Sequence, residues 1–198
     1  KVDTLSVHSD AMDKEVQVIT ICPDKAMAGE KCPVLYLLHG YGGNAGTWLG
    51  IKPELPQIAD KEGIIFVCPD GKNSWYWDSP LNKEYRYETF VSKELVNYID
   101  KNFTTKVERG GRAITGLSMG GHGSLWLSIR HKDVFGGGGS MSGGLDIRPF
   151  PNNWEMKKQL GEEASNKQRW DEHTVINQLD KIKNGDLAVI IDCGWGYF

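Results

Sequence analysis

Short apolar runs alternate with longer stretches of helical periodicity along this chain of 198 residues. A short run that is apolar throughout is typical of a strand buried on both faces, as in a parallel sheet. Two longer segments, 88–103 and 119–131, instead repeat their apolar side chains at helical spacing. The alternation predicts an open α/β sheet with right-handed crossovers. The expected strands are residues 15–22, 33–38, 63–68, 112–115, 135–141 and 187–192.

The length fits one domain, and we expect residues 1–198 to form a single domain. Residues 143–185 are too long and polar for a plain connection, so we expect a cap-like or edge insertion of short helices. A net charge of −3 without a basic stripe argues against nucleic acid as a partner. No apolar run of about 18 residues is present, and no membrane span is expected.

The four cysteines include no C-x-x-C pair, so neither a zinc ribbon nor a thioredoxin-type site is expected, and we predict no metal and no cofactor. Cys68 and Cys193 each end an apolar run, where a buried and inert thiol is expected. Cys22 and Cys32 flank a turn, and their spacing leaves open whether they form a disulfide.

The pentapeptide Gly116-Leu117-Ser118-Met119-Gly120 matches G-x-S-x-G, the pattern of a serine on a sharp strand-to-helix turn. It lies between the expected strand at 112–115 and the expected helix at 119–131, as a nucleophile elbow requires. The N-terminus of that helix favours a developing oxyanion. We predict that Ser118 is a catalytic nucleophile; the alternative is a tight glycine-rich turn with an idle serine.

A second glycine-rich segment, His39-Gly40-Tyr41-Gly42-Gly43, follows the expected strand at 33–38. A loop in this position of an α/β-hydrolase supplies one backbone donor of the oxyanion hole. By position, the N–H groups of Tyr41 and Met119 are the expected donors. We expect His39 and Gly40 to line the substrate site, with His39 orienting the loop. The alternative role of His39 as the base does not fit the order of this fold, which places the base last.

Together these motifs resemble the esterase D-like group of α/β-hydrolases. That group includes S-formylglutathione hydrolases, tributyrin esterases, feruloyl and acetylxylan esterases, and the antigen 85 mycolyltransferases. The resemblance implies an α/β-hydrolase fold, a mostly parallel open sheet with helices on both faces. It also implies a serine carboxylic ester hydrolase that works through an acyl-enzyme on small acyl, acetyl or feruloyl esters, including esters carried on carbohydrate. The matching stretches are Leu37–Gly43, Pro69–Gly71, Asn73–Tyr76, Tyr87–Phe90, Gly116–Gly121, Ser140–Gly143 and Ile191–Gly194.

The chain departs from the family pattern at the acid of the catalytic triad. The triad order in this fold is serine, acid, histidine. The resemblance places the acid in the loop after residues 192–194, where the aligned position is Tyr197 and carries no carboxylate. Asp192 is the nearest acid. It either takes the orienting role or is a plain strand-end residue.

The base is the larger departure, because no histidine follows the last expected strand, where the resemblance places it. We therefore expect that the base histidine is not present in this chain. We also expect that the parent protein continues beyond Phe198 and that this further segment covers a sheet edge and an apolar face. Without that segment the α/β-hydrolase fold is C-terminally incomplete, and this chain by itself is expected to have only residual activity. The five histidines are His8 near the N-terminus, His39 in the glycine loop, His122 expected to point away from Ser118, His131 at a helix end, and His173 expected at the surface.

Aromatic side chains gather in the expected upper loops, where open α/β sheets bind ligands. Trp75, Tyr76 and Trp77 follow a strand end and are candidate substrate-binding residues, by stacking on a sugar ring or a phenolic acyl group. The alternative is that these rings fill the base of a loop-rich cap. The four glycines at 136–139 are interpreted as close helix-on-sheet packing.

Two other functions stay open at this stage. One is an acyltransferase with the same nucleophile and an alcohol or sugar acceptor. The other is a non-catalytic protein that binds esters or glycans and has lost the acid and base. The expected partner is a small-molecule or polysaccharide-linked ester, and a homo-oligomer is allowed. We expect an extracytoplasmic location, periplasmic or secreted, with the cytoplasm as the alternative.

Overall fold

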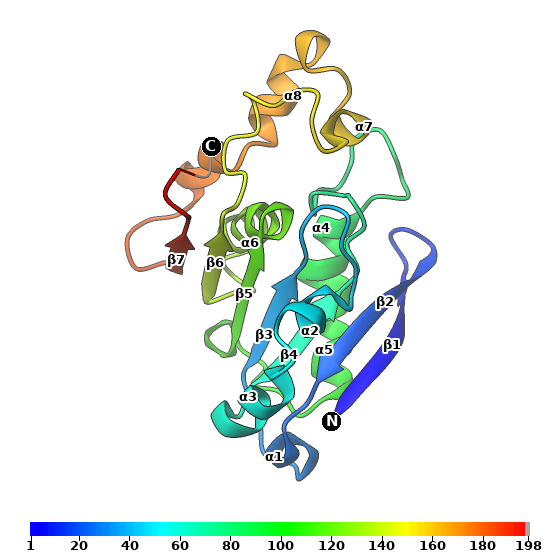
Figure 1. The fold of residues 1–198 in the computed structure, drawn as a ribbon, viewed down its shortest axis with the longest axis vertical. Coiled ribbons are helices and arrows are strands. Elements are labelled where there is room, and N and C mark those ends of the chain that lie inside the picture. The colour runs from blue at the N-terminus through cyan, green and yellow to red at the C-terminus, as the bar shows by residue number, and fades with distance from the viewer. Residues whose placement is uncertain (197–198) are drawn as a thin grey trace.

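In the computed structural model, which describes residues 1–196, one mixed sheet runs in the order β1-β2-β4-β3-β5-β6-β7 (Figure 1). Strands β4, β3, β5, β6 and β7 are mutually parallel, while β1 and β2 form an antiparallel hairpin at one edge. All six predicted strands are confirmed, and β1 is an addition. The strands are β1 (Val2–Ser9), β2 (Lys14–Ile21), β3 (Val34–Leu38), β4 (Ile65–Pro69), β5 (Arg112–Leu117), β6 (Gly137–Met141) and β7 (Ala188–Asp192).

Both predicted helices are confirmed. The first is a continuous helix in which a π-helical segment, η1, joins α4 to α5, and the second is α6. Short helices between residues 143 and 185 lie above the end of the sheet at which the parallel strands finish (Figure 1). The helices are α1 (Asp24–Met27), α2 (Thr47–Ile51), α3 (Leu55–Glu62), α4 (Tyr87–Thr89), η1 (Phe90–Leu95), α5 (Val96–Asn102), η2 (Arg109–Gly111), α6 (Met119–Arg130), α7 (Met156–Leu160), η3 (Glu163–Ser165), α8 (Lys167–Glu172) and η4 (Val175–Lys181).

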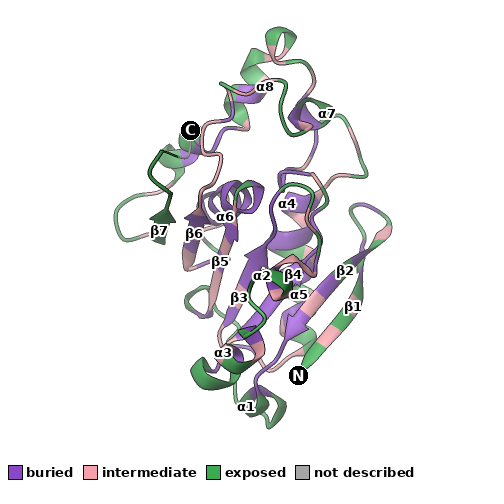
Figure 2. Cartoon of the chain, viewed as in Figure 1, coloured by how far each residue is buried: buried purple, intermediate pink, exposed green. Residues whose placement is uncertain are grey.

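The pleat of the central strands divides the core between the two faces of the sheet. On β3, Tyr36 and Leu38 pack into the cluster that includes η1, α5 and α6, whereas Leu37 packs into a second cluster with α2 and α3. Successive residues of a strand point to opposite faces, so one apolar strand supplies both cores. Burial is deepest on β4 and α6 (Figure 2). The structure thus has helices on both faces of a mostly parallel sheet, and the predicted α/β-hydrolase fold is confirmed.

The glycine run before and within β6 lets α6 lie close to the sheet. A Cβ atom at Gly138 would lie 2.1 Å from the Ser128 Oγ of α6 and 2.8 Å from the Ser128 Cβ, so a side chain there would push α6 away from the sheet. The interpretation of this run as close helix-on-sheet packing is therefore confirmed at Gly138. This packing sets the position of α6, whose first turn follows Ser118.

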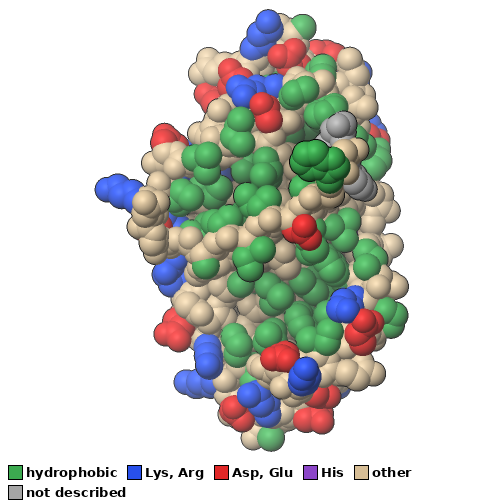
Figure 3. All heavy atoms as spheres, turned by 60° about the vertical axis from the view of Figure 1, so that its left-hand side comes forward, with side chains coloured by type: hydrophobic (Ala, Val, Ile, Leu, Met, Phe, Trp, Pro, Cys, Tyr) green, Lys and Arg blue, Asp and Glu red, His purple; other side chains and the backbone are tan. Residues whose placement is uncertain are grey.

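The β7 edge of the sheet is uncovered. All five residues of β7 are exposed, and Ile190 and Ile191 are 75% and 60% exposed. Figure 3 shows hydrophobic side chains gathered over this side of the molecule. Cys193 is exposed for the same reason, which corrects the prediction that it is buried; Cys68 is buried as predicted. Cys22 and Cys32 are buried free thiols and form no disulfide. Across the described residues, no helix is long and apolar enough to cross a membrane.

Candidate active site

Ser118 occupies a strained turn between β5 and α6. Its φ and ψ are 55° and −116°, an unfavourable region for a side chain with Cβ, and the residue is exposed. Cβ atoms at Gly116 and Gly120 would lie 2.3 Å from the Gly120 carbonyl oxygen and 2.2 Å from the Leu38 carbonyl oxygen. Only glycine fits at either position, so the G-x-S-x-G pattern follows from the geometry of the turn.

The glycine loop after β3 lies against this turn. A Cβ at Gly40 would be 3.4 Å from the Ser118 Cβ, which places the loop beside the serine. Met119 is the first residue of α6, and the N–H groups of the first helical turn have no partner within the helix. Within residues 1–196, the Tyr41 N–H also meets no protein acceptor. Two backbone donors are thus available beside the serine, at the positive end of a helix dipole.

His39 is held inside the loop by both ring nitrogens. Nδ1 lies 2.7 Å from the Gly40 carbonyl oxygen, and Nε2 accepts a hydrogen bond of 2.9 Å from the Gly71 N–H. This pairing corresponds to the neutral ring with the proton on Nδ1. The Tyr76 hydroxyl donates to the His39 carbonyl oxygen at 3.0 Å. Neither ring nitrogen is left for Ser118, and the ring is buried, so it lies behind the site rather than facing a substrate.

A cavity of about 250 Å³ opens at Ser118. Most of its wall is apolar and aromatic, which suits an uncharged group. Trp75 lines the cavity, and its Nε1 donates to the Trp154 carbonyl oxygen at 3.0 Å. Tyr76 and Trp77 are fully buried and do not line it, which corrects the expectation that all three aromatic residues face the substrate. The lining residues are Trp75, Ser118, Ser142, Gly144, Asp146, Ile147, Phe150, Trp154 and Met156.

Backbone strain concentrates around this cavity. Among the described non-glycine residues, those with positive φ lie in the cavity wall or next to the loops that build it, with one exception in the β1–β2 turn, Asp13. Such strain persists only where surrounding structure imposes it, and it is common at functional sites. The residues are Lys72, Trp75, Tyr76, Ser118, Ser142, Trp154 and Glu155.

Asp192 lies at the exposed end of β7. Its carbonyl oxygen accepts a hydrogen bond of 2.8 Å from the Ser142 N–H, so it reaches the edge of the cavity. Within the described residues its carboxylate has no hydrogen-bond or ion-pair partner, and no histidine lies against it. Tyr197, the position aligned with the family acid, lies outside the described residues.

The remaining histidines make contacts elsewhere. The His122 ring is buried behind Trp75, with Nδ1 3.1 Å from the Gly144 carbonyl oxygen, and burial lowers its pKa to about 4. His173 is half-buried and stacks on Trp126, so the expected surface position is only partly correct, and burial lowers its pKa. His131 contacts Glu88, and His8 contacts Glu15. No hydrogen bond joins any of them to the Ser118 hydroxyl in the part of the chain that the structure describes.

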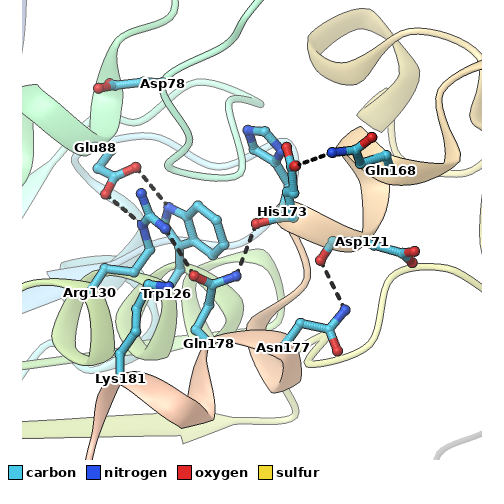
Figure 4. A pocket seen from close by; sticks show the side chains of 11 residues that line it. Asp78, Glu88, Trp126, Arg130, Gln168, Asp171, His173, Asn177, Gln178 and Lys181 are labelled. Atoms are coloured by element: carbon cyan, nitrogen blue, oxygen red, sulfur yellow. Dashed lines mark hydrogen bonds and ion pairs between the residues drawn. The ribbon is translucent and has the colours of Figure 1, made fainter.

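A larger cavity, of about 690 Å³, is lined in part by Trp126 and Arg130 of α6, and no serine, threonine or cysteine is among its described lining residues (Figure 4). Several of its polar side chains are paired with one another, as the dashed lines in Figure 4 show. The Glu88 carboxylate accepts hydrogen bonds from Trp126 Nε1 at 3.2 Å and from Arg130 Nε at 2.9 Å, and it lies 2.7 Å from His131 Nε2. Burial alone would raise the pKa of Glu88, but His131 and Arg130 outweigh it and lower the pKa. This network anchors the C-terminal half of α6 and is not the candidate active site.

Comparison with known proteins agrees with this geometry. The family model described as "Putative esterase" matches residues 9–196. The chain belongs to this esterase family. An acetyl esterase of Caldicellulosiruptor saccharolyticus is 29% identical over 151 residues, covering 72% of this chain and 56% of the relative. A diacylglycerol acyltransferase/mycolyltransferase, Ag85A of Mycobacterium leprae, is 34% identical over 155 residues, covering 73% of this chain and 44% of the relative.

Both relatives fall within the esterase D-like group that the motifs resemble, so the resemblance is confirmed. The chain spans about half the length of these two curated relatives. Among solved structures, FphF, a fluorophosphonate-binding serine hydrolase of Staphylococcus aureus, superposes with a TM-score of 0.82 at 20% identity, covering 98% of this chain and 79% of that chain. At that identity the match shows the shared fold.

Proposed function

We propose that Ser118 is the nucleophile of a carboxylic ester hydrolase that works through an acyl-enzyme. The observation that carries the proposal is an exposed serine on a strained turn, beside two backbone N–H groups that meet no protein acceptor within residues 1–196. Strain of this kind is kept where it presents a reacting atom. The esterase family membership supports the same reaction class.

The reaction divides into two halves. A base takes the Ser118 proton while Oγ attacks the ester carbonyl carbon, and the Tyr41 and Met119 N–H groups bind the resulting oxyanion. The alcohol leaves with the proton, and the acyl group stays on Ser118. Water then gives its proton to the base and attacks the acyl carbon. The acid leaves, and Ser118 regains its proton.

The base in this proposal is none of the five histidines of this chain. His39 uses both ring nitrogens, His122 is buried behind Trp75, and the other three contact distant carboxylates or rings. We infer that the whole protein presents another histidine to Ser118, and that Asp192, at the cavity edge, is the candidate to orient it.

The substrate proposed for this site is an ester with a small uncharged acyl group. The cavity of about 250 Å³ is lined by Trp75, Phe150, Trp154 and two aliphatic side chains. It accommodates an acetyl group and also a planar phenolic acyl group such as feruloyl. The acetyl esterase relative supports the first. The exposed Trp154 at the rim supports an ester carried on carbohydrate. That substrate class agrees with an extracytoplasmic location, which cell fractionation tests.

An acyltransferase is the second candidate, because the Ag85A relative is named as one. A hydrolase and an acyltransferase form the same acyl-serine and differ only in whether water or another acceptor takes the acyl group. Partition between water and an added alcohol or sugar acceptor separates the two reactions. Within residues 1–196 the Asp192 carboxylate has no hydrogen-bond or ion-pair partner, and this favours the non-catalytic alternative, in which Ser118 is idle.

The test is hydrolysis of p-nitrophenyl acetate by the full-length protein and by its Ser118→Ala variant. We expect the variant to lose at least about 10³-fold in kcat, because the nucleophile is removed while the oxyanion donors stay. Equal rates in the two proteins would remove Ser118 from the mechanism.

A further inference from the structure

One asparagine joins the glycine loop to the cavity wall. Asn73, in the loop after β4, accepts a hydrogen bond of 2.8 Å from the Gly42 N–H through Oδ1. Its Nδ2 donates a hydrogen bond of 3.0 Å to Glu155 Oε2. Gly42 follows β3, and Glu155 directly precedes α7, so this single side chain connects three segments that are distant in the sequence.

The Gly42 N–H belongs to the peptide that sets the shape of the loop. The Gly43 N–H donates to the Gly40 carbonyl oxygen at 3.0 Å, and Gly42 has φ of +77°, the arrangement of a type II turn with Tyr41 and Gly42 at its centre. Types I and II differ by a flip of the central peptide. By accepting from the Gly42 N–H, Asn73 selects one orientation of the Tyr41–Gly42 peptide.

Glu155 fixes the other end of this bridge. The pKa of the Glu155 carboxyl is lowered, because its charged form accepts hydrogen bonds from Lys158, Asn73 and the Tyr41 hydroxyl. The preceding residue, Trp154, lines the cavity and receives the Trp75 indole N–H on its carbonyl oxygen. Trp154 and Glu155 both have positive φ, so this wall segment is strained and held by its contacts.

We propose that Asn73 and Glu155 are positioning residues that couple the oxyanion loop to the acyl-binding wall. The inference rests on the proposed function, in which the Tyr41 N–H is an oxyanion donor. Tyr41 and Gly42 are exposed, so apolar packing does little to hold the tip of this loop. The bridge fixes the Tyr41–Gly42 peptide and so restrains, through the backbone of Tyr41, the preceding peptide that carries the donor N–H. Its loss lowers kcat more than it raises KM, because oxyanion donors act mainly in the transition state.

The test exchanges donor and acceptor across the bridge in the full-length protein, with p-nitrophenyl acetate as substrate. Asn73→Asp places two carboxylates in contact, and we expect kcat to fall about 10- to 100-fold with KM within about threefold. Glu155→Gln keeps an acceptor for Asn73, and a loss of less than about threefold is expected. In the double variant, the amide introduced at position 155 donates to the carboxylate introduced at position 73, and kcat returns to within about threefold of the wild type. Asn152→Ala, an exposed asparagine of the same wall segment, is the matched control and keeps wild-type kcat.

Two results would overturn the inference alone while leaving Ser118→Ala inactive. One is wild-type kcat in Asn73→Asp, and the other is a double variant as slow as Asn73→Asp, which shows that the two side chains are not coupled. Wild-type activity in Ser118→Ala would overturn the proposed function and the inference together. If that slow double variant also has a lower unfolding midpoint than the wild type, the role of the two side chains is merely structural.

Discussion

At the scale of single residues, the site depends on positions where no atom can be added. Gly120 makes the closest approach to backbone of these, because a Cβ there would meet the Leu38 carbonyl oxygen at 2.2 Å. The obstacle is backbone, which cannot rotate away as a flexible side chain can. The elbow and the strand beside it must therefore shift together if this glycine is replaced.

We expect Gly120→Ala to lower stability by about 1–3 kcal/mol and to reduce ester hydrolysis at least about 10-fold, since the turn that presents Ser118 is distorted. Urea unfolding and p-nitrophenyl acetate kinetics measure the two effects. Gly110→Ala is the control, because nothing lies within 4 Å of a Cβ at that position. Equal stability and activity in the two variants would show that the elbow tolerates a side chain.

Several residue-level features could be predicted from the sequence, and others could not. The position of Ser118 was predictable because the tight turn itself demands glycine on both sides. The sequence left open whether Tyr76 and Trp77 face the substrate or fill the base of a cap. It could not decide, because Trp75 and Tyr76 have positive φ, and neither strand nor helix periodicity then relates neighbouring side chains. The Asn73–Glu155 contact joins residues 82 apart and leaves no local pattern in the sequence.

At the scale of elements, α6 links the site to the rest of the core. Its first turn follows Ser118, its middle carries the buried His122 and Trp126, and its end carries Arg130, which pairs with Glu88. The sequence predicted this helix from its spacing. It did not predict His173 stacked on Trp126, because that contact depends on how the segment after residue 143 folds back.

The buried His122 makes stability depend on pH. The unfolded chain takes up a proton near pH 6.5, whereas the folded protein does so only near the lowered pKa of about 4. Stability therefore falls as pH is lowered from about 6.5 to about 4, by roughly 2–3 kcal/mol from this group. The measurement is the urea unfolding midpoint as a function of pH, for the wild type and for His122→Gln. The midpoint of His122→Gln should change less steeply with pH than that of the wild type. His8 is exposed with a raised pKa, so the pH slope of His8→Gln should change in the opposite sense. An unchanged slope in His122→Gln would contradict the account.

The Glu88 network should be the main polar support of α6. We expect Glu88→Gln to destabilise the fold by about 2–3 kcal/mol, because Arg130 and His131 lose their buried carboxylate partner. The free energy of unfolding in urea is the measurement. Glu108→Gln, at an exposed glutamate, should change it by less than about 0.5 kcal/mol. If both variants matched the wild type, the network would contribute nothing to stability.

At the scale of the whole molecule, sequence patterns predicted the parallel sheet and its fold class. The missed strand β1 lies at the sheet edge, where polar side chains face solvent and the apolar signal is weak. The helices α1, α2 and α3 are too short to show a helical period. The order of the strands depends on crossovers that only the assembled sheet reveals.

The uncovered β7 edge predicts self-association of the 198-residue chain. An exposed apolar edge strand offers unpaired backbone groups and a hydrophobic face to a second molecule. Ile190→Lys places a charge on the most exposed of the large hydrophobic side chains of that strand and should lower the association measured by light scattering. A wild-type chain that stays monomeric at the same concentration would contradict this expectation.

The most direct test of the central claim is covalent labelling of the full-length protein with a fluorophosphonate, followed by peptide mass spectrometry. An activated serine displaces the fluoride and keeps the phosphonyl group. The account predicts a single adduct on the peptide that contains Ser118 and none in the Ser118→Ala variant or the urea-unfolded protein. An unlabelled protein, or an adduct on Ser142 or another serine in place of Ser118, would contradict it.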